Sequence, residues 1–107
     1  MSTEIALKRI ATAKAGNHVY LDLSGLGLTE VPSELFECTA LRILYLDNNY
    51  ISELPEAIEN LVNLESLYLR DNKLSSLPKS IKKLTKLEKV DSLYNTKGLY
   101  WRKSKSN

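Results

Sequence analysis

The chain has 107 residues, of which 43% are hydrophobic and 26% charged, a composition typical of one folded domain and not of a disordered chain. Its single cysteine, Cys38, excludes an intramolecular disulfide and fits a reducing compartment. No window approaches the ~18 apolar residues of a membrane span. Lys8, Arg9 and Lys14 interrupt any signal-peptide core at the N-terminus. We therefore expect a cytoplasmic protein that does not enter a membrane.

Residues 3–15 are predicted to form a helix, because Ser2 or Thr3 can cap its N-terminus and Gly16 followed by Asn17 can end it. Its apolar stripe consists of Ala6, Leu7, Ile10, Ala11 and Ala13. This stripe is too small and too rich in alanine to anchor the chain in lipid. We interpret the helix as a cap over the first turn of the structure that follows; a helix that binds a partner is the alternative.

After the helix, the sequence repeats itself with a period of 23 residues. Three rows span residues 18–40, 41–63 and 64–86, and a fourth begins at residue 87 and then loses the pattern. Asn49 recurs as Asn72 and Asn95, and "LYLDNN" returns as "LYLRDN". The apolar positions shared by rows two and three are Leu41/Leu64, Leu44/Leu67, Leu46/Leu69, Ile51/Leu74, Leu54/Leu77, Ile58/Ile81 and Leu61/Leu84.

Each row has the pattern of one coil. Its L-x-L segment predicts a short strand with one buried face, and the asparagine that follows can satisfy backbone groups where the chain leaves the strand. Seven buried apolar side chains contribute very roughly 10–20 kcal/mol per row. Ordering 23 residues costs more than that, at ~1–2 kcal/mol per residue. One row is therefore unstable alone and must stack on its neighbours.

Rows two and three follow the motif LxxLxLxxNxLxxLPxxIxxLxx almost letter for letter, so that the chain resembles the leucine-rich repeat family over residues 18–95. The opening "LDLSGLGLTEVP" is also similar to the start of the repeat arrays of Roco-type proteins, although no phosphate-binding loop of a GTPase is present. The resemblance implies an α/β fold: a right-handed leucine-rich repeat solenoid with a short parallel β-sheet on its concave face, an irregular or 3-10 convex side and an N-terminal capping helix.

The expected organisation is a single domain. It consists of a cap helix in residues 1–17, three repeats in residues 18–86, and a partial fourth repeat with a C-terminal cap and basic tail in residues 87–107.

Residues between the buried leucines of each strand are expected to point outward. The resemblance implies that this concave face binds a protein or peptide partner. The candidate partner-binding residues are Tyr20, Asp22, Tyr45, Asp47, Tyr68, Arg70 and Asp91. Tyrosine and arginine are enriched in binding hot spots, but a tyrosine in this place is also simply a good strand residue. Asp47 and Arg70 are neighbours in the 23-residue register, so we expect an exposed ion pair between them.

No catalytic, metal or cofactor site is predicted. Cys38 stands where row two has Leu61, so we expect it to be buried, and His18 is expected in the loop that enters the first strand. Asp22 and Asp91 would lie roughly 14 Å apart across the sheet. This distance is too long for a shared metal ion or for a pair of carboxylates that cleaves a glycoside. We therefore expect a protein that is not an enzyme.

The net charge of +2 is unevenly distributed, with 6 Lys/Arg and 11 Asp/Glu in residues 1–78 but 9 and 2 in residues 79–107. The basic segment "KSIKKLTKLEK" (79–89) could suit nucleic acid. However, the register places Lys79 beside Glu56 and Lys82 beside Glu59. We interpret this segment as part of a ladder of weak surface pairs and "RKSKSN" (102–107) as a solvated tail, so no nucleic-acid partner is expected.

The pattern fails in residues 92–107, where Ser92 and Lys97 replace apolar residues. Two interpretations remain open. Either Leu93, Tyr94, Leu99, Tyr100 and Trp101 form an irregular cap, or the last strand keeps a free edge through which two copies form a homodimer. The expected function is therefore a non-enzymatic protein-protein interaction module, and the alternative is a structural repeat unit that self-associates through its C-terminal edge.

Overall fold

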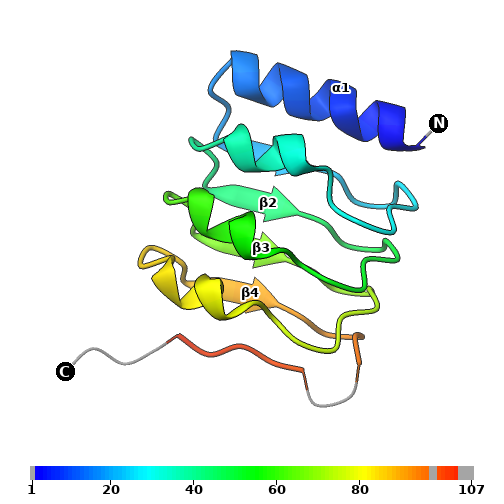
Figure 1. Cartoon of the computed structure of the whole chain (residues 1–107), viewed down its shortest axis with the longest axis vertical. Helices are drawn as coiled ribbons and strands as arrows, with labels where there is room; N and C mark the ends of the chain where they lie inside the picture. Colours follow the sequence, from blue (N-terminus) through cyan, green and yellow to red (C-terminus); the bar gives the residue numbers. More distant parts are fainter. Residues whose placement is uncertain (1, 97–98, 104–107) are drawn as a thin grey trace.

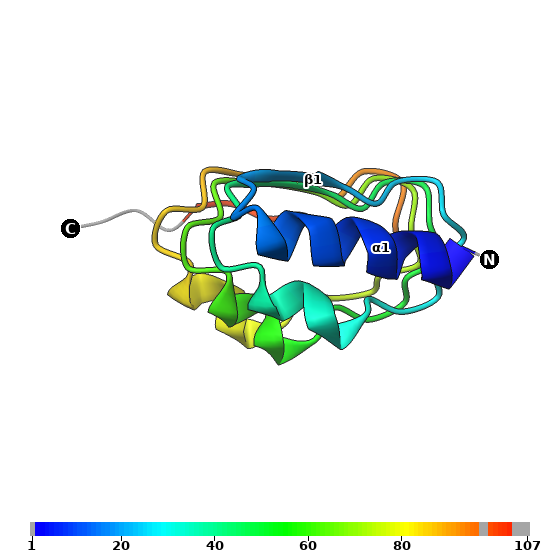
Figure 2. The same cartoon turned by 90° about the horizontal axis from the view of Figure 1, so that it is seen from above.

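The computed structural model describes residues 2–96 and 99–103, without the side chain of Ser2. In this part of the chain, α1 (Ser2–Ala15) precedes four short strands that alternate with three 3-10 helices. The strands are β1 (Tyr20–Asp22), β2 (Ile43–Tyr45), β3 (Ser66–Tyr68) and β4 (Lys89–Asp91), and the 3-10 helices are η1 (Ser33–Glu37), η2 (Glu56–Asn60) and η3 (Lys79–Lys83). The chain winds in successive coils, with the sheet on one side and the 3-10 helices on the other (Figure 1 and Figure 2).

The four strands form one parallel sheet in the order β1-β2-β3-β4, and each residue pairs with the residue 23 positions further along. Leu21 lies opposite Leu44, which lies opposite Leu67. Equivalent side chains therefore stack from coil to coil. The solenoid with a parallel sheet, predicted from the repeat, is confirmed.

The leucine positions of the repeat form the core. In the two central coils the following side chains have no solvent exposure: Leu41, Leu44, Leu46, Ile51, Ile58, Leu61, Leu64, Leu67, Leu69 and Leu74. Each coil covers the apolar face of the next. The apolar side chains that an isolated coil would expose to water are therefore buried by its neighbours. Cys38 is buried as predicted, and its thiol contacts the carbonyl oxygen of Ile10 at 3.6 Å.

A ladder of asparagines satisfies backbone groups inside the coils. The amide nitrogen of Asn49 donates to the carbonyl oxygens of Leu23 and Leu46, each at 3.0 Å. Its side-chain oxygen accepts hydrogen bonds from the N–H groups of Leu26 (3.1 Å) and Leu28 (3.0 Å). Asn72 and Asn95 make equivalent bonds one and two coils further on. The role predicted for these asparagines is therefore confirmed by their geometry.

A tight turn follows each strand and requires a left-handed backbone. Positive φ angles recur every 23 residues, at Gly25 (67°), Asn48 (56°), Asp71 (61°) and Tyr94 (59°). Glycine, asparagine and aspartate tolerate this conformation best. Tyr94 is the exception in residue type, and its side chain is exposed over 69% of its surface, as Asn48 and Asp71 are also exposed at this turn position.

The helix α1 covers the first coil, as predicted (Figure 2). It buries Ala6, Ile10 and Ala13, whereas Leu7 and Ala11, also assigned to the apolar stripe, are exposed. The prediction was wrong for these two residues because the buried face is narrow: Ala6, Ile10 and Ala13, one step of four and one of three residues apart, already define it. The guanidinium of Arg9 donates to the carbonyl oxygen of Asp22 at 2.9 Å and so occupies an outward backbone group of β1.

On the opposite side of the coils, the acidic helix η2 packs against the basic helix η3. The carboxylate of Glu56 accepts the backbone N–H of Ser80 at 2.9 Å, and this bond, with the Ser80 hydroxyl, lowers the pKa of Glu56. Glu59 forms its ion pair with Lys83 (3.3 Å) and not with the predicted Lys82. The contacts on this side join residues 24 apart, one more than the 23 of the sheet register.

The end of the stack is capped only in part. Leu99 and Trp101 pack against the core, as the cap interpretation requires, whereas Leu93, Tyr94 and Tyr100 are exposed and do not form the predicted cap. Ser92 is buried and its hydroxyl donates to the carbonyl oxygen of Leu99 at 3.4 Å. The predictions for Lys97 and for residues 104–107 lie outside the described residues.

Replacing Asn49 by alanine is expected to lower the free energy of unfolding by about 2–4 kcal/mol, because five buried or partly buried backbone groups lose a partner. Urea unfolding at neutral pH measures the difference. Asn60→Ala is the control, since Asn60 is exposed and its side chain has no hydrogen bond in the described residues. An equal effect of the two substitutions would contradict a stabilising role for the ladder.

Candidate functional site

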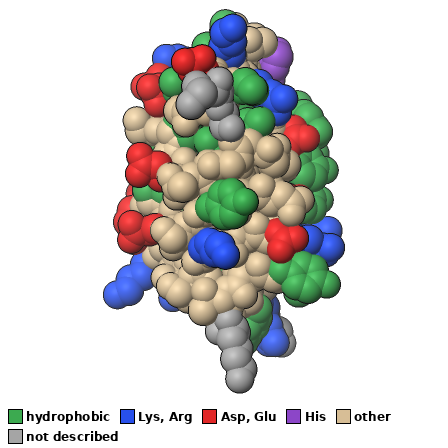
Figure 3. Space-filling view, turned by 90° about the vertical axis from the view of Figure 1, so that its right-hand side faces the viewer, with side chains coloured by type: hydrophobic (Ala, Val, Ile, Leu, Met, Phe, Trp, Pro, Cys, Tyr) green, Lys and Arg blue, Asp and Glu red, His purple; other side chains and the backbone are tan. Residues whose placement is uncertain are grey.

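The outward side chains of the four strands, together with the residue two positions after each strand, form a surface that we call the sheet face. The inward residues Leu21, Leu44 and Leu67 are buried, so that their neighbours along each strand point to the opposite side. All the predicted partner-binding residues lie on this face: Tyr20, Asp22, Tyr45, Asp47, Tyr68, Arg70 and Asp91. In Figure 3, hydrophobic side chains form a column along the right-hand edge, which is the sheet side of the molecule.

Three tyrosines form a continuous aromatic stack across the sheet. The rings of Tyr45 and Tyr68 are parallel within 6°, with centroids 4.3 Å apart, and the Tyr20 ring is tilted by 56° at 5.4 Å from that of Tyr45. The stack exists because the parallel register places these residues on adjacent strands. Burial of Tyr45 between its neighbours raises the pKa of its hydroxyl, and the neighbouring Tyr68 raises it further.

Cations border the aromatic stack on its β4 side. The ammonium of Lys89 lies 5.0 Å from the centroid of the Tyr68 ring, within the range of a cation–π interaction. The guanidinium carbon of Arg70 lies 5.8 Å from the centroid of the Tyr94 ring. Tyr94 was expected in the C-terminal cap and not on this face. Tyr94 occupies the left-handed turn after β4, and its ring lies beside Arg70 of the preceding coil.

The predicted ion pair between Asp47 and Arg70 is absent from the described residues. The Arg70 guanidinium instead pairs with Asp91 at 3.0 Å. Asp47 accepts the backbone N–H of Arg70 at 2.9 Å, so its carboxylate helps to hold the exit of β3. The prediction was wrong because the register relates the α-carbons, whereas the long arginine side chain reaches across to the next strand.

The three aspartates of the sheet face have partly structural roles. Asp22 and Asp91 each accept the N–H of the residue two positions on, Ser24 at 2.9 Å and Leu93 at 3.2 Å. Burial raises the pKa of the Asp47 carboxyl. The hydrogen bond from the Arg70 backbone N–H lowers this pKa, and the nearby negative charge of Asp91 raises it further. Asp22 and Asp47 therefore present carboxylates that are not neutralised by an ion pair within the described part of the chain.

The residues considered for chemistry do not come together. His18 is exposed in the entry to β1, and Cys38 lies buried after η1, where burial raises the pKa of its thiol. No group of three or more His, Cys, Asp and Glu side chains that could hold a metal ion occurs among residues 2–96 and 99–103. α1 has 14 residues, and no helix in the described part of the chain has the length and apolar character needed to cross a membrane.

The coil geometry, the leucine core and the asparagine ladder together define a solenoid of leucine-rich repeats. The family model for a leucine-rich repeat region matches residues 19–97, and the chain therefore belongs to the leucine-rich repeat family. A solved leucine-rich repeat protein from Leptospira interrogans is 37% identical in sequence, with a TM-score of 0.69. The match covers 77% of this chain but only 22% of that protein. No curated protein matches the chain. Domains of this family generally mediate protein–protein interactions and are typically non-enzymatic.

Asp47→Asn is expected to stabilise the protein more at pH 7 than at about pH 3. Because burial raises the folded-state pKa, ionisation of Asp47 costs stability as the pH rises through that pKa, and asparagine removes this cost while still accepting the Arg70 N–H. Thermal unfolding at both pH values gives the difference in Tm between variant and wild type. Asp71→Asn, at an exposed aspartate, is the control; a pH-independent difference at Asp47 would refute the assignment.

Proposed function

We propose that the chain is a non-enzymatic interaction module that binds a peptide or a segment of a protein partner through the sheet face. The observation that carries the proposal is the outward-facing stack of the exposed Tyr20 and the half-buried Tyr45 and Tyr68. Rigid aromatic side chains provide a large contact area and lose little conformational entropy on binding, and tyrosine is enriched in hot spots. The outer face of the stack is not needed for core packing, because the leucines that alternate with these tyrosines already fill the core.

The carboxylates on the β1 and β2 side of the stack, away from Lys89, favour a partner segment that carries a basic side chain. Arg70 and Asp91 neutralise each other at 3.0 Å, whereas Asp22 and Asp47 remain available to a cation. A sheet of four strands is about 15 Å across. This width suits one helix or one extended segment better than a large globular interface. In the proposed organisation, residues 1–107 act as one domain in the cytoplasm, where a reducing environment suits the lone Cys38.

The double variant Tyr45→Ala/Tyr68→Ala tests the proposal. Wild type and variant are used to capture proteins from the source cell, and affinity is then measured with each isolated partner. The variant is expected to bind at least about 30-fold more weakly, as for the loss of ~2 kcal/mol at a hot spot. Tyr50→Ala, at an exposed tyrosine off the strands, is the matched control and is expected to bind like wild type. A folded double variant with unchanged affinity would rule out the tyrosine stack as the binding surface.

Self-association is the second candidate function, and the outer edge of β4 favours it. Within the described residues β4 pairs with β3 alone, and β1 at the other edge is approached by Arg9. An unpaired strand edge is a template for another chain. Light scattering over a range of protein concentrations measures the mass in solution. A dimer whose population rises with concentration would support edge pairing, and a monomer at the highest concentration would exclude it.

A further inference from the structure

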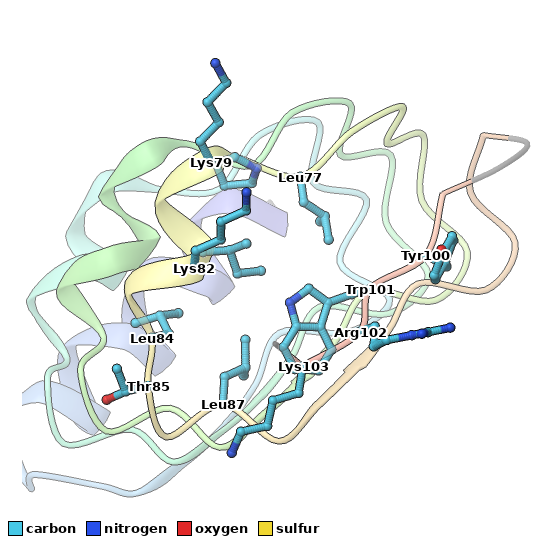
Figure 4. Close-up of a pocket in the computed structure, with 12 residues that line it drawn as sticks. Leu77, Lys79, Lys82, Leu84, Thr85, Leu87, Tyr100, Trp101, Arg102 and Lys103 are labelled. Carbon is cyan, nitrogen blue, oxygen red and sulfur yellow. The ribbon is translucent and has the colours of Figure 1, made fainter. Parts of the chain in front are cut away.

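The last coil leaves an apolar cavity of about 630 Å³ between η3 and residues 99–103 (Figure 4). Leu77, Leu84, Leu87 and Trp101 line it, and Figure 4 shows their side chains facing one another across the end of the core. This volume lies within the range of protein sites that bind small molecules or side chains. The cavity is on a different part of the molecule from the sheet face and does not depend on the function proposed there.

In the 23-residue register, the fourth row has no apolar residue at the positions equivalent to Ile81 and Leu84. In the stack, Ile81 and Leu84 follow Ile58 and Leu61 by one coil, and all four side chains lie in the core. The residues 23 positions further on are Ser104 and Asn107, both polar.

Trp101 adds a hydrogen-bond donor to the cavity. Its ring is half-buried against the core, and its indole nitrogen is turned toward the side of the cavity formed by η3 (Figure 4). This N–H has no hydrogen-bond partner within residues 2–96 and 99–103. An indole N–H is a donor only, so it favours an occupant that offers a carbonyl or carboxylate oxygen.

The rim of the cavity is cationic. Among its twelve described lining residues are Lys79, Lys82, Arg102 and Lys103, and none of the twelve is acidic. Lys103 pairs with Glu88, whereas Lys82 and Arg102 have no ion pair in the described part of the chain. An apolar floor within a cationic rim is complementary to a segment that combines apolar side chains with carboxylates.

The opposite side of η3 already packs against a segment of this kind. In η2 and the residue that follows it, Ile58 and Leu61 enter the core, while Glu56 contacts the Ser80 N–H and Glu59 pairs with Lys83. The basic helix η3 thus packs against a neighbour that presents two apolar side chains three residues apart, with glutamates beside them. The cavity offers a similar surface, and no acidic segment of residues 2–96 and 99–103 lines it.

We propose that this cavity binds a short acidic amphipathic segment of a partner protein, whose two apolar side chains lie against Leu84, Leu87 and Trp101 and whose carboxylates face Lys82 and Arg102. A second copy of the chain fits this surface less well. The acidic surface that a second copy could offer, near η1, is itself a hollow lined by Glu30, Glu34 and Glu53. A hollow surface offers no projecting apolar side chain for the cavity.

The probe is the peptide SELPEAIENLVN, which is the sequence of residues 52–63 and carries Glu56, Ile58, Glu59 and Leu61. Trp101 is the only tryptophan, so its fluorescence reports on the cavity directly. Titration is expected to give a saturable blue shift below ~1 mM peptide. In Lys82→Glu/Arg102→Glu the affinity is expected to fall at least about tenfold, and in Lys8→Glu/Lys73→Glu, which reverses two charges elsewhere, to stay unchanged. Circular dichroism verifies that each variant is folded.

The same titration with SKLPKAIKNLVN, in which lysines replace the glutamates, is expected to show no binding. The proposal is overturned if the acidic peptide causes no change up to ~1 mM, if the lysine peptide binds equally, or if Lys82→Glu/Arg102→Glu has no effect. A dimer of the free protein that this charge reversal dissociates would identify a second copy as the occupant and would also overturn it. Tyr45→Ala/Tyr68→Ala is expected to bind the probe normally, which separates this result from the test of the sheet face.

Discussion

The amide side chain of one asparagine in each of the second, third and fourth coils makes the rest of this structure possible. A coil that buries its leucines also takes backbone N–H and carbonyl groups out of water, and each unsatisfied group costs about 1–3 kcal/mol. Asn49 uses both its nitrogen and its oxygen on such groups, reaching back to Leu23 in the preceding coil as well as to Leu46 in its own. The ladder therefore joins adjacent coils while it satisfies them, and it holds the strands in the register on which the sheet face depends.

That register determines what each side of the molecule presents. On the sheet side, residues related by 23 positions become neighbours, and the tyrosines stack because their positions repeat. On the opposite side, the same stacking brings the acidic η2 against the basic η3. The uneven charge along the sequence is therefore partly neutralised between coils. Beyond the last acidic coil, Lys82 and Arg102 border the terminal cavity without an ion pair in the described residues.

The fold could be predicted from the sequence because the 23-residue period of the apolar residues equals the length of one coil, so that equivalent residues stack on one another. The positions of the tyrosines and aspartates on the sheet face followed from α-carbon register alone. What could not be predicted depends on side-chain reach and local backbone: Arg70 extends to Asp91, Lys83 replaces Lys82 as the partner of Glu59, and Tyr94 adopts a left-handed turn. For the terminal coil the sequence left a cap and a free edge both open, since the repeat pattern no longer constrains that segment, and the structure shows a partial cap made by Leu99 and Trp101.

The unequal ends of the stack imply that its stability is graded along its axis. In a one-dimensional array each coil is held mainly by its immediate neighbours, so local opening propagates from whichever terminus is least protected. α1 seals the first coil with Ala6, Ile10 and Ala13, whereas the last coil relies on Leu99 and Trp101. Fraying therefore begins at the C-terminal coil and proceeds toward the helix. Any molecule that sits on that coil slows the opening of coils it never touches, because they are reached only through it.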